Sequence, residues 1–146
     1  MVFDLVPKDE PEAIEIHDRN CILIIDSDQR HLVRLADSFS SQGFKVLSHT
    51  KGQYGFETAK KSQPDCILVD IDLIDTSGMD LCRAIVDSPN TCGIPVIVMG
   101  KATCYQTVQE ARAAGCQFFV CKPVDPKALL MLVNESIAEA RSWICD

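Results

Sequence analysis

Acidic residues and one lysine stand at the ends of short apolar runs along this chain. The first run is followed by Asp26-Ser27-Asp28 and the third by Asp70-Ile71-Asp72. The fourth and fifth are followed by Gly100-Lys101 and Lys122-Pro123. In open α/β sheets the ligand site lies beyond the carboxyl ends of the strands. If the runs are parallel strands, these carboxylates and the lysine meet at one edge of the sheet.

Several carboxylates around one ammonium group suit a hard divalent cation. Mg²⁺ takes oxygen ligands, often one or two carboxylates, together with water and phosphate oxygens. The lysine supplies a mobile positive charge that can pair with an anion bound beside the metal. The chain has no glycine-rich phosphate loop, which disfavours a nucleotide site. A carboxylate that accepts a phosphoryl group fits better, because Asp is a known covalent nucleophile for phosphate.

Five apolar runs of strand length position these groups, and they span residues 21–25, 44–47, 66–69, 95–99 and 117–121. Between them, apolar residues recur three or four positions apart, the spacing that lines one face of a helix. Gly43, Gly115 and Pro126 mark helix ends and starts. The first, third and fourth runs are apolar on both faces, whereas the second is typical of an edge strand. The pattern predicts a doubly wound α/β sandwich of five β-α units.

The composition fits one soluble domain. The chain has 146 residues, of which 47% are hydrophobic and 24% charged, ordinary values for a packed globule. Its net charge of -7 has the wrong sign for direct binding of nucleic acid. No apolar run approaches the roughly 18 residues that span a bilayer, and the N-terminus does not read as a secretory signal. We expect a cytoplasmic protein without membrane contact, with an acidic arm at residues 1–20 and a folded domain at 21–146.

Eight cysteines raise the question of a zinc or disulfide site. No two are spaced Cys-x-x-Cys, the spacing that places two sulfurs on one metal or in one redox turn. The three histidines also lie apart from any cysteine cluster. Four cysteines, at positions 21, 66, 116 and 121, lie in or beside apolar runs. We expect these to be reduced thiols that pack as small apolar side chains.

The order and spacing of these motifs resemble the receiver domain of bacterial two-component response regulators. The resemblance covers about residues 20–140. It rests on four segments, which are residues 24–28, 64–81, 94–100 and 114–123. The family has a flavodoxin-like fold, so the resemblance implies a five-stranded parallel sheet in the order 2-1-3-4-5. It also implies Mg²⁺ as cofactor.

The resemblance implies roles for single residues. Asp70 matches the phosphoacceptor, and Lys122 matches the lysine that contacts the phosphoryl group. Asp26 matches the first member of the metal-binding acidic pair, and Asp72 falls where a backbone carbonyl ligates the metal. Three further matches are the glycine of the following loop at Gly78, a cis bond between Lys122 and Pro123, and a switch aromatic at Phe119.

Three positions depart from the family's pattern. Ser27 stands where the second acid of the pair ligates the metal in the family, which makes it a fourth candidate metal-site residue besides Asp26, Asp70 and Asp72. Because a neutral hydroxyl replaces a carboxylate there, the affinity for the metal should fall. Gly100 stands at the switch position, where the family has Thr or Ser to hydrogen-bond the phosphoryl group, and the hydroxyl is absent. Thr103 would need a rearranged loop to replace it. Ile74 replaces a common proline, which changes loop stiffness more than chemistry.

Other residues near the site are expected to be structural. Asp28 is the expected cap of the first helix, since Asp accepts hydrogen bonds from first-turn amides. Asp75 and Asp80 are expected to be solvated or capping acids. Phe118 and Phe119 point to opposite faces of the last strand, so at least one belongs to the core.

The leading interpretation is a signalling domain, not an enzyme with an external substrate. It takes a phosphoryl group from a histidine kinase or phosphotransfer protein onto Asp70 with Mg²⁺. Its output passes to a protein partner or a homodimer through residues 103–143. The alternative, suggested by Ser27 and Gly100, is a pseudo-receiver that binds partners without phosphotransfer. A flavodoxin-type cofactor binder is disfavoured because no Ser/Thr/Gly-rich loop follows the first strand.

Overall fold

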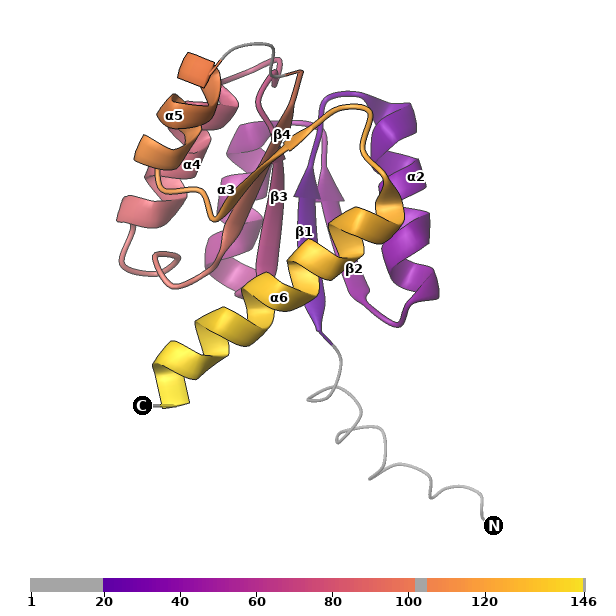
Figure 1. The fold of residues 1–146 in the computed structure, drawn as a ribbon, viewed down its shortest axis with the longest axis vertical. Coiled ribbons are helices and arrows are strands. Elements are labelled where there is room, and N and C mark those ends of the chain that lie inside the picture. Colours follow the sequence, from indigo (N-terminus) through magenta and orange to yellow (C-terminus); the bar gives the residue numbers. More distant parts are fainter. Residues whose placement is uncertain (1–19, 102–104, 146) are drawn as a thin grey trace.

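A parallel sheet forms the centre of the molecule. The computed structural model describes residues 20–101 and 105–145. Its five strands lie in the order β2-β1-β3-β4-β5, which confirms the predicted topology (Figure 1). They are β1 (Cys21–Ile25), β2 (Lys45–His49), β3 (Cys66–Asp70), β4 (Val96–Gly100) and β5 (Phe118–Cys121). Each strand end lies within two residues of its predicted position.

The three central strands are covered on both faces. Every residue of β3 and β4 is buried, and so is all of β1 except its first residue. By contrast, β2 and β5 lie at the two edges of the sheet and contain half-buried and exposed residues. Continuous Val, Ile and Leu runs suit strands between two helical layers. The prediction of an edge strand at residues 44–47 is confirmed.

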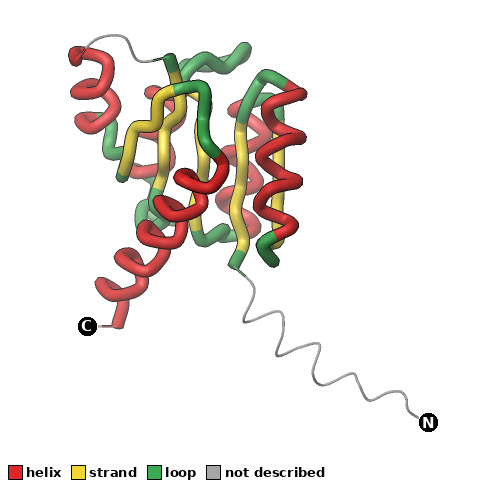
Figure 2. Tube along the Cα trace, turned by 45° about the vertical axis from the view of Figure 1, so that its right-hand side comes forward, coloured by secondary structure: helices red, strands yellow, loops and turns green. Residues whose placement is uncertain are grey.

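Helices cover both faces of the sheet, as the tube view shows (Figure 2). The described helices are α2 (Gln29–Ser41), α3 (Gly52–Ser62), α4 (Gly78–Asp87), α5 (Tyr105–Ala113) and α6 (Pro126–Cys145). On one face, Leu32 and Phe39 of α2 and Leu129 of α6 pack against β1, β3 and β4. On the other face, α3, α4 and α5 supply residues such as Ala59 and Ile85. The two apolar layers fix the sheet between them.

The helix ends follow the predicted punctuation. Asp28 caps α2, and its side chain accepts hydrogen bonds from two first-turn amides. Gly43 and Gly115 adopt φ angles of +93° and +102° after α2 and α5, a region where a Cβ is strained. Pro126 is the first residue of α6, where its missing N–H costs no helix hydrogen bond.

Some predictions fall outside the described residues. Residues 1–19 of the predicted acidic arm are among them, so the arm stays a prediction. Thr103, in the loop after β4, also lies outside them. Among residues 20–101 and 105–145, no helix combines the length and apolarity needed to cross a membrane.

The buried cysteines behave as core residues. Cys66 and Cys116 pack in the two apolar clusters, as predicted, whereas Cys121 is exposed at the end of β5. Burial raises the pKa of Cys66 and of Cys82 to about 12, and it also raises the pKa of Cys116. Because only the thiolate is a good nucleophile, we expect these three thiols to be unreactive in the folded protein.

We therefore predict that Cys66, Cys82 and Cys116 resist alkylation at about pH 8 until denaturant unfolds the chain. Cys92 is exposed and should react in the folded protein. Labelling with iodoacetamide, followed by peptide mass spectrometry, measures each site. Fast labelling of Cys66 without denaturant would contradict the burial described above.

Candidate functional site

The sheet brings three predicted site residues to one edge. β1 and β3 are neighbours and end at nearly the same level, so Asp26 emerges beside Asp70. β5 lies two strands away from β3 and ends at Cys121, so Lys122 has to reach across the end of β4. A lysine side chain is long enough for that span. The carboxyl ends of the strands thus converge as the order of the motifs predicts.

Lys122 pairs with Asp70. Its Nζ lies 2.9 Å from Asp70 Oδ2 and 3.9 Å from Asp26 Oδ2. The Asp70 side chain is only 5% exposed, so this ion pair is largely shielded from water. Asp70 Oδ1 accepts a hydrogen bond of 3.0 Å from the backbone amide of Asp72. The predicted cis bond between Lys122 and Pro123 is present.

Asp26 is fully buried beside Asp70. Its Oδ1 accepts a hydrogen bond of 2.9 Å from the backbone amide of Asp28. Its Oδ2 pairs with Nδ1 of His31 and also faces Lys122. Burial raises the pKa of Asp26, and the Asp70 carboxyl group adds to the rise, although His31 and the Asp28 amide act against it. Two acids this close and this buried need positive charge nearby.

The two buried carboxylates fit Mg²⁺, whereas the Ser27 hydroxyl is engaged elsewhere and the Asp72 side chain is exposed. Ser27 Oγ donates to the Thr50 carbonyl at 3.1 Å and accepts from the Ile74 amide at 3.0 Å, so it joins two loops. Asp72 has an exposed side chain. Within residues 20–101 and 105–145, no three His, Cys, Asp or Glu side chains are arranged to hold a metal ion. A Mg²⁺ ion here would have two carboxylates at most, which is within its usual range.

Gly78 allows α4 to begin against the end of β3. A Cβ at this position would overlap the carbonyl oxygen of Asp70 and lie 2.5 Å from Ile71 Cα. Its amide donates to the Ile71 carbonyl at 2.9 Å. Because these neighbours are backbone atoms that cannot move aside, residue 78 has to be glycine for the loop to close this tightly.

At the predicted switch position, apolar packing fills the place of the missing hydroxyl. A Cβ on Gly100 would overlap the Ile71 side chain, 3.2 Å from its Cβ, and would lie 3.4 Å from Phe119 Cζ. Ile71 and Phe119 both pack against the same core cluster. Phe118 packs against the opposite one, so the two rings straddle the sheet as predicted.

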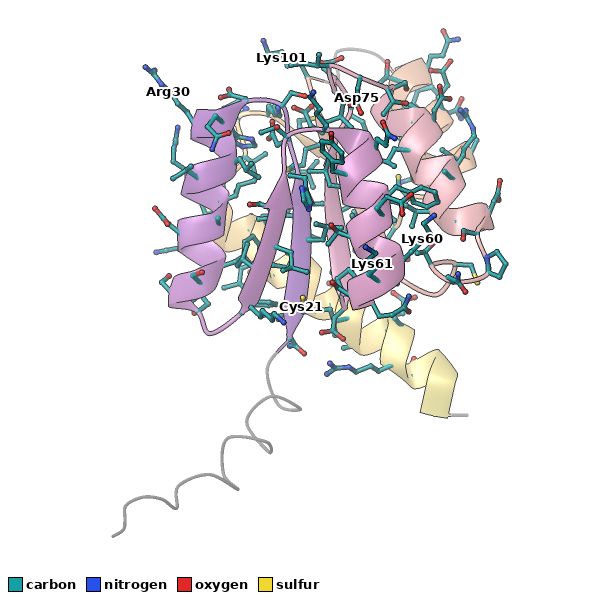
Figure 3. The ribbon with its side chains drawn as sticks, turned by 180° about the vertical axis from the view of Figure 1, so that it is seen from behind. Cys21, Arg30, Lys60, Lys61, Asp75 and Lys101 are labelled. Atoms are coloured by element: carbon teal, nitrogen blue, oxygen red, sulfur yellow. The ribbon has the colours of Figure 1, made fainter. Side chains whose placement is uncertain are left out.

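Asp75 caps a helix from a distant loop. The first residue before α3, Lys51, offers no side-chain cap. Instead, Asp75 accepts hydrogen bonds from the amides of Gly52 and Gln53 at 2.8 and 3.0 Å. Figure 3 shows Asp75 at the same end of the molecule as Arg30 and Lys101. The expected capping role of Asp75 is confirmed, and the helix it caps is α3.

Sequence reasoning missed His31, which contacts Asp26 directly. His31 is the third residue of α2, the helix that Asp28 caps. Helical side chains lean toward the N-terminus of their helix, so a side chain at this position leans back toward the end of β1. The signal was therefore present in the spacing between Asp26, the cap and His31.

We predict that Asp75→Ala lowers the free energy of unfolding by about 1 kcal/mol at neutral pH, the usual cost of a lost cap. The Gln53 and Gly52 amides hold the pKa of Asp75 below its usual range. The stabilisation is therefore present above about pH 4 and is lost as pH falls through the lowered pKa. Urea unfolding at several pH values measures the difference between the two proteins. The prediction would be wrong if the difference in the free energy of unfolding between the wild type and Asp75→Ala stayed constant down to about pH 3. It would also be wrong if Asp37→Ala, the exposed-acid control, lowered the free energy of unfolding equally.

We also predict that Gly100→Thr destabilises the fold by about 1–3 kcal/mol, because stiff, β-branched Ile71 occupies the space. Adding Ile71→Ala should recover part of that loss, and a double-mutant cycle by urea unfolding measures the coupling. Gly93→Ala is the matched control, since a Cβ there meets nothing within 4 Å. Strict additivity of the two changes would show that Ile71 does not fill the site.

Comparisons with known proteins agree with this geometry. Residues 22–134 match the family model of the response regulator receiver domain. Protein PilH of Pseudomonas aeruginosa is 27% identical over 80% of this chain and 97% of its own. The polar-differentiation response regulator DivK of Brucella anthropi is 21% identical over 82% of this chain and 97% of its own. Protein RcaC of Microchaete diplosiphon is 27% identical over 85% of this chain, which spans only 19% of that longer protein.

Solved structures share the fold. A CheY-like receiver domain protein from Methanospirillum hungatei has a TM-score of 0.79 and 22% identity, over 85% of this chain and 98% of its own. A two-component response regulator from Clostridium difficile has a TM-score of 0.76 and 22% identity, over 82% and 97%. These likenesses establish the architecture, and the family model covers most of the sequence. The chain belongs to the response regulator receiver domains of two-component systems.

Proposed function

We propose that this receiver domain accepts a phosphoryl group on Asp70 from a sensor histidine kinase or a phosphotransfer protein. The observation that carries the proposal is the pairing of the nearly buried Asp70 carboxylate with Lys122 at 2.9 Å, beside the buried Asp26. Receiver domains are signalling domains. The proposed role is therefore to carry a signal, and not to turn over an external substrate.

The chemistry is a nucleophilic displacement at phosphorus. An oxygen of Asp70 forms a bond to the phosphorus of a phosphohistidine as the P–N bond breaks, and the leaving imidazole takes up a proton. Lys122 Nζ pairs with Asp70 Oδ2 and is placed to neutralise charge on the incoming phosphoryl oxygens. Receiver domains generally bind Mg²⁺ at this acidic pocket, and Asp26 and Asp70 are the residues that would hold it here. When bound, the ion supplies positive charge to the same oxygens.

Two exposed basic side chains lie at the pocket end of the molecule, beside the exposed acids Asp28, Asp72 and Asp75. Arg30 and Lys101 project from the same end of the molecule (Figure 3), and both are exposed. They stand out in a chain whose net charge is -7. Positive charge near a site attracts anions such as a phosphorylated side chain.

The proposed output is a protein–protein contact through residues 103–143, with a downstream partner or a second copy. This segment is described from residue 105 on and includes α5, β5 and most of α6. It carries Tyr105 and Met131, which are 75% and 72% exposed. The acidic charge argues against direct nucleic-acid binding. We propose a cytoplasmic protein without membrane contact.

A second candidate function is a pseudo-receiver that binds partners without being phosphorylated. The observation that favours it is the filled switch position, where Ile71 occupies the space beside Gly100 that a hydroxyl would need. The engagement of Ser27 with Thr50 and Ile74 points the same way, because it removes an expected metal ligand.

Intact-mass measurement after incubation with an acyl phosphate separates the two functions. We expect a single phosphoryl adduct that requires Mg²⁺ and is absent in Asp70→Asn. Asp72→Asn is the matched control: this acid lies two residues further on, its side chain is exposed, and its loss should leave the adduct unchanged.

An adduct that persists in Asp70→Asn would show that the acceptor is another residue. If no adduct forms on folded protein, with an acyl phosphate or with a phosphorylated histidine kinase, the chain is a pseudo-receiver.

A further inference from the structure

We infer that His31 competes with Mg²⁺ for Asp26 and so lowers the metal affinity of the site. The inference deepens the proposed function, because it concerns the ion that would assist phosphorylation of Asp70. His31 Nδ1 contacts Oδ2 of Asp26, and its own side chain is 18% exposed while that of Asp26 is not exposed at all. The imidazole thus lies between a buried carboxylate and the solvent side of the pocket.

Asp26 has no oxygen without a partner in this arrangement. Its Oδ1 receives the amide of Asp28 at 2.9 Å, a contact fixed by the turn into α2. Its Oδ2 is the oxygen that faces Lys122 and the pocket, and His31 holds it. Mg²⁺ demands a nearly octahedral shell with short bonds and keeps several waters. While Oδ2 is bonded to the imidazole, an ion has to displace that contact before it can use this oxygen.

The position of His31 is fixed by the start of the helix. Asp28 accepts hydrogen bonds from the backbone amides of Arg30 and His31, at 3.1 and 3.4 Å. The first turn of α2 is therefore held beside the end of β1. His31 can leave Asp26 by rotating its side chain, without any change in the helix. Metal binding then requires only that rotation.

The charge in the pocket favours the covered state. Asp26 and Asp70 face one fixed cation, Lys122, and the residue after Asp26 is the neutral Ser27, whose hydroxyl joins two loops. The ammonium group neutralises part of the negative charge of the two carboxylates and so weakens their attraction for a divalent ion. A contact from His31 to one of those carboxylates is enough to compete with it.

The same geometry argues against His31 as a metal ligand. Mg²⁺ is a hard ion that takes oxygen ligands in preference to imidazole nitrogen. In addition, His31, Asp26 and Asp70 do not form a group that could hold an ion as they stand in the described residues. His31 therefore acts on the metal site through Asp26, as a positioning residue.

Apparent affinity falls in proportion to the fraction of molecules in the binding-competent state. Loss of a hydrogen bond to a charged group is enough to change the apparent Mg²⁺ affinity by about tenfold or more. We expect His31→Ala to bind Mg²⁺ at least about tenfold more tightly than the wild-type chain. His31→Gln, whose amide can still donate to Asp26, should stay close to the wild type.

Isothermal titration of Mg²⁺ into the full chain, at one fixed pH and ionic strength, measures these affinities. His49→Ala is the matched control, because the His49 side chain bonds to Thr58 and to no site carboxylate. Its affinity should equal that of the wild type. Thermal unfolding gives a second readout: Mg²⁺ should raise the melting temperature of His31→Ala more than that of the wild type.

Weaker Mg²⁺ binding by His31→Ala would identify His31 as a ligand and overturn the inference. Equal binding, or no binding by either protein, would overturn it as well. If His31→Ala does not fold, His31→Ser gives the same test, because its short side chain removes the imidazole from Asp26, and tighter binding is again the expected result.

The inference and the proposed function fail in distinguishable ways. If no phosphodonor produces an adduct on Asp70 but His31→Ala binds Mg²⁺ more tightly, phosphorylation is rejected and the competition between His31 and Mg²⁺ for Asp26 is supported. If a Mg²⁺-dependent adduct forms on Asp70 but His31→Ala does not change the affinity for Mg²⁺, phosphorylation is supported and the competition is rejected.

Discussion

Two carboxylates that must be buried next to each other are the constraint on which this structure depends. Asp26 and Asp70 lie at the ends of adjacent central strands, away from water that would solvate their charge. An unpaired buried charge is costly, so each acid needs hydrogen-bond donors or a cation. Lys122 provides the cation at 2.9 Å from Asp70 and 3.9 Å from Asp26. The order of the strands, the turn after β5 and the length of a lysine side chain all have to be right for that contact to form.

Asp26 and Asp70 obtain hydrogen-bond partners for their buried carboxylates in the same way. The Oδ1 of each accepts a hydrogen bond from the backbone amide two residues further on, from Asp28 for Asp26 and from Asp72 for Asp70. Such local turns fix the carboxylate and the first residues of the loop together. In both cases Oδ2 is left facing the pocket, where it meets Lys122 and, for Asp26, His31. In each carboxylate, one oxygen therefore holds the following loop and the other faces the pocket.

Features of the site that depend on strand ends and helix starts could be predicted from the sequence, whereas contacts between distant loops could not. The apolar runs locate the strand ends to within two residues, and the ends of parallel strands meet, so the grouping of Asp26, Asp70 and Lys122 could be predicted. The cap at Asp28 followed from its residue type and its place before a helix. The contact of His31 could have been inferred from its spacing to Asp26 and to the Asp28 cap. The contacts of Ser27 depend on how two loops cross, which no short-range pattern encodes. The capping of α3 by an acid 23 positions away belongs to the same class.

At Gly100, the position predicted from the family to carry a switch hydroxyl, the described packing is apolar. Ile71 follows Asp70 directly, and its side chain fills the space beside Gly100 and near the ring of Phe119. A hydroxyl at position 100 would act on the site through a directional hydrogen bond, which forms only when an acceptor is present. Ile71 acts through packing, which needs no hydrogen-bond acceptor and is sensitive to small displacements because protein interiors are close-packed. A displacement of Ile71 in the loop after Asp70 would therefore change the packing beside Gly100 and in the apolar cluster that Phe119 also contacts, and this needs no hydroxyl at position 100.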